Sequence, residues 1–172
     1  MKRSILTTAG LSLALLLCLS VVYAGAAGQK LQSPSPSQRL VGTWDVTLRL
    51  PGCTNACPCP PGVTPDTLIP ALQTYSSDGT MEEVYGGSLL LFRSDALGSW
   101  EQVGGQQYSA RYKFFIFEPT TGERLFTDVV TSHIELQGRD AFEATATFNR
   151  FEADGVTPVR SGCPIEITGR RF

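Results

Sequence analysis

The segment that most constrains the fold is residues 40–50, where apolar and polar side chains alternate. In an extended chain one face carries Leu40, Gly42, Trp44, Val46, Leu48 and Leu50, and the other carries Val41, Thr43, Asp45, Thr47 and Arg49. This alternation predicts a β-strand with one buried face. A glycine two residues before Trp44 allows backbone to approach the indole closely, so we expect the ring to close one end of a core.

The same pattern continues along the chain, with turn residues about every eight to fifteen positions. Further strands are expected at residues 67–75, 80–85, 99–103, 108–117, 124–136, 141–151 and 163–172. The dipeptide Asp78-Gly79 predicts a tight hairpin. Residues 89–92 fit either a buried strand or a lid segment, because a short apolar run has no diagnostic period.

About eight sequential strands joined by hairpins lose both free edges when the sheet closes on itself. The sequence therefore predicts an all-β fold, a closed antiparallel eight-stranded up-and-down barrel. An immunoglobulin-like sandwich is the alternative. The spacing of cysteine, tryptophan and cysteine expected of that fold is not found around Trp44, because Trp44 precedes every cysteine expected in the mature chain.

The N-terminus has the layout of a secretory signal peptide, which we place at residues 1–24. Two basic residues precede an apolar run that is shorter than the roughly 20 residues of a spanning helix, so cleavage is favoured over an uncleaved anchor. A lipoprotein is the lesser alternative, because Leu17 stands before Cys18 where a small residue is usual. We expect a secreted or periplasmic protein with no membrane span in its mature chain.

The mature chain divides into a flexible Ser/Pro leader, residues 25–39, and a β-barrel domain, residues 40–172. Residues 51–66 hold five prolines, which deny the backbone its donors and so predict a loop. This loop is also a candidate surface for a protein partner. The net charge of −2 offers no basic surface for nucleic acid, so no nucleic-acid partner is expected.

Signal-peptide removal leaves four cysteines, namely Cys53, Cys57, Cys59 and Cys163. An even number in an oxidising compartment predicts two disulfides, and three pairings are open. We favour a bridge from the cluster at residues 53–59 to Cys163, because the last strand of a closed barrel returns beside the first. A zinc site is the alternative, but this spacing matches no common zinc pattern. We therefore expect no metal and no cofactor.

The triplet Gly42-Thr43-Trp44, on the first strand of an eight-stranded meander, resembles the Gly-x-Trp signature of the lipocalin and wider calycin group. In that group a basic residue from the end of the barrel packs over the tryptophan, and Arg170 or Arg171 is the matching candidate here. The resemblance implies a lipocalin-like barrel that holds a small apolar molecule.

Aromatic side chains are the main candidates for binding a ligand inside the barrel. By alternation the inward set is Trp44, Tyr75, Trp100, Tyr108, Tyr112, Phe114, Phe142 and Phe148. The alternative is that these rings simply fill a narrow barrel. Tyr108 and Tyr112 favour a pocket, because buried hydroxyls need partners that a ligand or water can supply.

Catalytic candidates are few. His133 is the only histidine, and Glu135 shares its strand face. The opposite face of that strand is more apolar, so alternation directs His133 toward solvent. We expect Asp45 and Asp128 to face solvent too. A Gly-x-Ser-x-Gly nucleophile motif is absent from the sequence.

Together these patterns favour a protein that binds a small apolar or amphipathic ligand without transforming it. Two alternatives stay open at the level of the sequence. One is a small-barrel enzyme of the cyclase or isomerase type, and the other is a protein-interaction module that uses the loop at residues 51–66.

Overall fold

The computed structural model describes residues 39–51, 54, 57–59, 64, 67–86 and 92–172. The expected signal peptide, the leader up to residue 38, Cys53 and residues 89–91 lie outside the described residues. No helix within the described ranges is long and apolar enough to cross a membrane.

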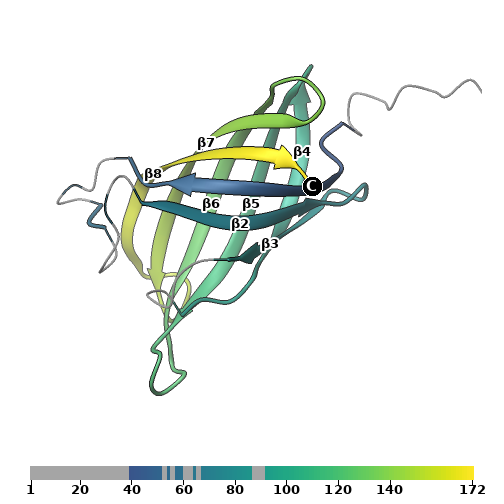
Figure 1. Ribbon diagram of the computed structural model, residues 1–172. Helices are drawn as coiled ribbons and strands as arrows, with labels where there is room; N and C mark the ends of the chain where they lie inside the picture. Colours follow the sequence, from purple (N-terminus) through teal and green to yellow (C-terminus); the bar gives the residue numbers. More distant parts are fainter. Residues whose placement is uncertain (1–38, 52–53, 55–56, 60–63, 65–66, 87–91) are drawn as a thin grey trace, which may run out of the picture. The chain divides into compact units, whose positions relative to one another are not determined.

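Eight antiparallel strands form a closed barrel in sequence order, and the last strand pairs with the first (Figure 1). The strands are β1 (Gly42–Arg49), β2 (Leu68–Tyr75), β3 (Thr80–Tyr85), β4 (Ala96–Gly104), β5 (Gln107–Phe117), β6 (Arg124–Leu136), β7 (Ala141–Glu152) and β8 (Pro158–Arg171). The predicted all-β, eight-stranded up-and-down barrel is confirmed. Residues of alternate parity face inward and form one core.

Two strands begin at least three residues earlier than the sequence predicts, β4 at Ala96 and β8 at Pro158. The first five residues of β8 show no alternation of burial, so they carry no amphipathic signal. They are strand because they pair with β7 across register shifts, as at Arg150 opposite Arg160. The start of this strand is determined by backbone hydrogen bonds to β7, which do not depend on the pattern of apolar and polar side chains.

One end of the barrel, which we call the Trp44 end, is plugged by the tryptophan. Its Nε1 donates to the Leu40 carbonyl at 2.8 Å, and the Arg171 guanidinium carbon lies 4.2 Å from the ring centroid. Arg171 is thus the basic residue over the indole, and Arg170 is exposed. Gly42 has a φ of 132°, which residues with a side chain rarely adopt, and a Cβ there would also lie 2.7 Å from Arg171 Nη1, so the position favours glycine.

The other end, which we call the loop end, holds the connections β1–β2, β3–β4, β5–β6 and β7–β8. The longest of these is the Pro-rich connection between Arg49 and Leu68. The two ends therefore differ in construction: one is closed by packed side chains, and the other is bordered by loops.

Candidate functional site

The eight aromatic side chains predicted to face inward all do so. Six are buried and two, Trp100 and Phe148, are partly buried against the core. Five of them, Trp44, Tyr75, Trp100, Tyr108 and Phe142, form a chain of ring contacts with centroids 5.1 to 6.5 Å apart. These five fill the Trp44 end. The other three, Tyr112, Phe114 and Phe148, line the interior closer to the loop end.

A buried polar network crosses the interior from Tyr75 toward the loop end. The Tyr75 hydroxyl donates to Gln73 Oε1 at 2.6 Å, and Gln73 Nε2 donates to Glu83 Oε2 at 2.6 Å. Arg93 Nη2 donates to Glu83 Oε1 at 2.7 Å, with the Glu83 side chain 0% exposed. The carboxylate is thus held by two donors inside the protein, the arrangement that a buried charge requires.

Two aromatic rings also pack against the Arg93 guanidinium. Its central carbon lies 3.8 Å from the centroid of Phe114 and 4.7 Å from that of Tyr85. Such stacking favours a desolvated guanidinium. Sequence reasoning missed this network, although Glu83 shares the inward parity of Met81 and stands opposite Gln73 in the β2–β3 ladder.

A second buried ion pair joins β6 to β7. Arg150 Nε and Nη2 donate to the two carboxylate oxygens of Asp128 at 2.7 and 2.6 Å. The expectation that Asp128 faces solvent is wrong, because this residue is 2% exposed. It shares the parity of Val130 on the buried face of β6, and its register partner Arg150 neutralises it there. Asp45 is exposed, as expected.

Arg160 adds a second cation beside this pair. It stands opposite Arg150 in the β7–β8 ladder, and partial burial together with the Arg150 charge lowers its pKa. The Asp128 carboxylate partly offsets this effect on Arg160. Two guanidinium groups and a buried carboxylate thus meet at the loop end of the β6–β8 wall.

The interior hydroxyl of Ser132 has no hydrogen-bond partner among the described residues, and that of Tyr112 lies beside the Glu83 carboxylate without a hydrogen bond of good geometry. Both residues are 2% exposed, and they lie on the neighbouring strands β5 and β6. Burial and the nearby Glu83 carboxylate raise the pKa of Tyr112 well above its usual value. An unpaired buried hydroxyl costs about 1 to 3 kcal/mol, so the Ser132 hydroxyl calls for a polar partner such as water or a ligand.

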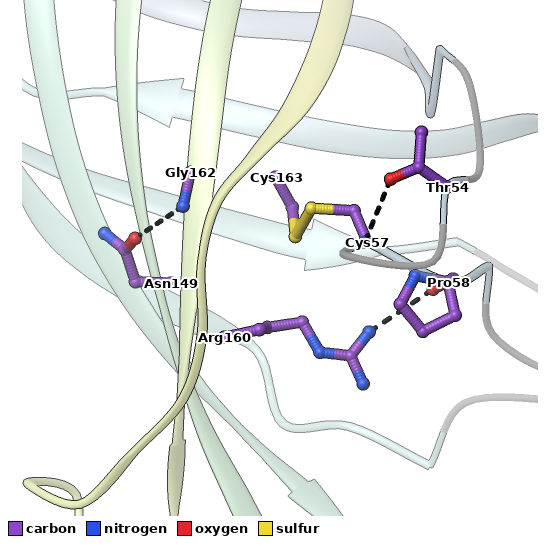
Figure 2. The surroundings of a disulfide bond; sticks show 7 residues. All are labelled: Thr54, Cys57, Pro58, Asn149, Arg160, Gly162 and Cys163. Atoms are coloured by element: carbon purple, nitrogen blue, oxygen red, sulfur yellow. Dashed lines mark hydrogen bonds between the residues drawn. A yellow bond between two sulfur atoms is a disulfide. The ribbon is translucent and has the colours of Figure 1, made fainter.

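A disulfide joins Cys57 of the β1–β2 loop to Cys163 of β8, at a sequence separation of 106 (Figure 2). The bridge that we favoured, from the cysteine cluster to Cys163, is confirmed. Cys59 is also disulfide-bonded, whereas Cys53 lies outside the described residues. The loop is further attached by Arg160 Nη1, which donates to the Pro58 carbonyl at 3.3 Å. A disulfide indicates an oxidising compartment.

No protein-family model, no curated protein and no solved structure matches this chain. The closed eight-stranded barrel with a tryptophan plug is compatible with a lipocalin-like fold. Since a fold hosts many functions, the function has to be argued from the residues of the site.

His133 and Glu135 lie on the outer face of β6, exposed to solvent. They border an outer groove of about 580 Å³, together with Glu143 and Glu166. The structure does not bring them to the interior aromatic residues. Across the described ranges, no three side chains of the His, Cys, Asp or Glu type are placed to hold a metal ion.

The described tyrosines support a prediction about alkaline pH. Burial raises the pKa of Tyr75, Tyr85, Tyr108 and Tyr112 above the ordinary value of 10.0. Above about pH 10 the folded chain therefore keeps protons that the unfolded chain loses, so stability falls as the pH rises further. We expect tyrosinate absorbance to appear together with loss of the far-ultraviolet circular dichroism signal. Complete tyrosine titration near pH 10 with the β signal intact would contradict this.

Proposed function

We propose that this protein is a secreted or periplasmic barrel that carries a small amphipathic molecule in its interior without transforming it. The observation that supports this most directly is the buried Ser132 hydroxyl, which lacks a partner in the described structure, next to the buried Tyr112 hydroxyl, which has the Glu83 carboxylate as a neighbour. A core evolved only for stability pairs its polar groups or omits them. A ligand with its own polar atoms supplies the missing partner.

The side chains around Ser132 are small, which favours a ligand over a filled core. Ala110 and Ala146 are its register partners on β5 and β7, and Ala144 lies next along β7 on the same face. An eight-stranded barrel holds either packed side chains or one small ligand. Alanine and serine side chains are too small to fill the interior at this level. The apolar part of the ligand belongs at this level.

The charges at the loop end favour an amphipathic ligand over a purely apolar one. Arg150 and Arg160 are register partners, and Arg150 donates to the Asp128 carboxylate. Arg160 donates instead to the neutral Pro58 carbonyl. An acidic or strongly hydrogen-bond-accepting head group could accept hydrogen bonds from the Arg160 guanidinium. We propose that the ligand enters at the loop end, since the Trp44 end is filled by packed aromatic rings.

Two independent features support this compartment. The Cys57–Cys163 bridge requires an oxidising environment, and the layout of residues 1–24 is that of a secretory signal peptide. Both are compatible with export, and together they support a carrier that works outside the cytoplasm.

Native mass spectrometry of the protein purified from its own compartment tests the proposal. We expect a stoichiometric small mass that is lost on denaturation. Ser132→Ala removes the unpaired hydroxyl and Tyr112→Phe removes the hydroxyl beside Glu83, and each should weaken retention of that mass by roughly tenfold. His133→Ala, on the outer face, is the control and should retain the mass fully.

The opposite result is equally clear. A bare polypeptide mass, combined with unchanged or increased stability of Tyr112→Phe, would indicate a filled core and contradict the carrier function. The interaction role of the loop at residues 51–66 stays a prediction, since most of that segment lies outside the described residues.

A further inference from the structure

We propose that an outer groove on β4, β5 and β6 is a second binding site, for a small organic anion that carries an aromatic ring. The groove has a volume of about 490 Å³, within the range of small-molecule sites. Its principal lining residues are Arg111, Lys113, Phe115, Arg124, Thr127 and Asp154. The site lies on the outer face of the barrel, so it does not depend on whether the interior holds a ligand.

Charge is the first observation. Arg111 and Lys113 are exposed, and neither forms a salt bridge within the described part of the chain. Arg124 donates to the Ala153 carbonyl, which is a neutral partner. Three cations thus line one groove of a protein whose net charge is −2. A local cluster of this kind concentrates anions against the overall charge of the molecule.

The one carboxylate in the groove is already engaged. Asp154 Oδ1 accepts from the amides of Val156 and Thr157, each at 2.9 Å, and its Oδ2 accepts from the Thr157 hydroxyl at 2.5 Å. These hydrogen bonds, with the nearby Arg124 charge, hold the pKa of Asp154 below its usual value. Asp154 therefore orders the β7–β8 turn and leaves the other cations uncompensated.

An aromatic surface accompanies the cations. Arg124 Cζ lies 5.0 Å from the Phe115 ring centroid, and Lys113 Nζ lies 5.9 Å from it. Leu97, which stands opposite Lys113 on β4, is 64% exposed at the groove wall. A ring of the ligand can pack on Phe115 and Leu97 while its acidic group reaches the cations.

A buried hydroxyl with no partner completes the site. Thr127 is 4% exposed and lines the groove, and its Oγ1 makes no hydrogen bond to any described residue. It lies 3.7 Å from the position that a Cβ would take on Gly155, so the β7–β8 turn lies next to this hydroxyl. A hydroxyl buried in this way is a donor for the acid oxygen of a bound anion.

The experiment is an amide-resolved nuclear magnetic resonance titration of the full-length protein with 1-naphthoate. We expect saturable shifts centred on Lys113, Phe115, Thr127 and Gly155, and an affinity that falls as salt is added. The neutral analogue 1-naphthalenemethanol should bind at least tenfold more weakly. Saturation at residues of the barrel interior alone, or equal binding of the neutral analogue, would overturn the proposal.

Matched variants separate the site from a general charge effect. Lys113→Ala should weaken naphthoate binding by roughly tenfold, whereas Arg170→Ala makes the same charge change on β8 and should leave binding unchanged. Thr127→Val removes the unpaired hydroxyl at nearly constant volume and should weaken binding while the barrel stays at least as stable. Equal loss with Lys113→Ala and Arg170→Ala, or full binding by Thr127→Val, would contradict the assigned site.

Discussion

Glu83→Ala is expected to lower the free energy of unfolding by about 3 to 5 kcal/mol, among the largest effects of any single substitution here. Glu83 is 0% exposed and accepts hydrogen bonds from Arg93 and Gln73. Its removal leaves the Arg93 guanidinium inside the protein, 5% exposed and without its carboxylate. Desolvation of a charge that has lost its partner is the dominant cost.

Urea unfolding measures the effect, and the chain supplies a matched control. Glu82 is the preceding residue on β3, has the same side chain and points to the exposed outer face. Glu82→Ala should change stability by less than about 0.5 kcal/mol. The double variant Glu83→Leu, Arg93→Met should recover most of the loss, because an apolar pair replaces an ion pair of similar size. Equal stability of Glu83→Ala and Glu82→Ala would contradict the buried network.

The double variant Cys57→Ala, Cys163→Ala is expected to cost about 4 to 5 kcal/mol. The bridge spans 106 positions, so its removal releases a long closed loop in the unfolded chain. It also detaches the β1–β2 loop from β8 at the loop end of the barrel. Thermal and urea unfolding of the oxidised proteins measure the difference.

Asn149→Ala is the local control for this second prediction. The Asn149 side chain accepts a hydrogen bond from the Gly162 amide at 2.9 Å, beside the bridge (Figure 2). Its loss should cost only about 0.5 to 1.5 kcal/mol, because one hydrogen bond disappears and no loop opens. If the double cysteine variant is no less stable than Asn149→Ala, the bridge does not constrain the unfolded chain as proposed.

The fold could be predicted from the sequence because a strand with one buried face carries apolar side chains at alternate positions. Trp44 and Val46 on β1, and Tyr112 and Phe114 on β5, lie inward as alternation predicts. Position in the closed barrel also made Cys163 the expected partner of the early cysteine cluster. The start of β8 at Pro158 could not be predicted, since its first residues are held by ladder pairing and bury no apolar face.

The polar part of the candidate site was harder to predict. Glu83 and Asp128 occupy inward positions. From the sequence alone a carboxylate is expected to be exposed, because the cation that would neutralise it inside the protein is not known. The partners are Arg93, 10 residues from Glu83, and Arg150, 22 residues from Asp128. Sequence spacing does not indicate either pairing, because strand register and the loop before β4 bring them together.

The sequence by itself determined the class of fold, the order of strands, the inward aromatic set and the residue that plugs one end, because each depends on local alternation or on a short motif. Only the tertiary structure decided that Arg171 rather than Arg170 covers Trp44, that two ion pairs lie inside, and that the buried Ser132 hydroxyl lacks a partner among the described residues. Those features depend on distances between strands across the closed barrel. The alternation of apolar and polar residues indicates which face of a strand a residue occupies. It does not indicate which side chain of another strand that residue contacts.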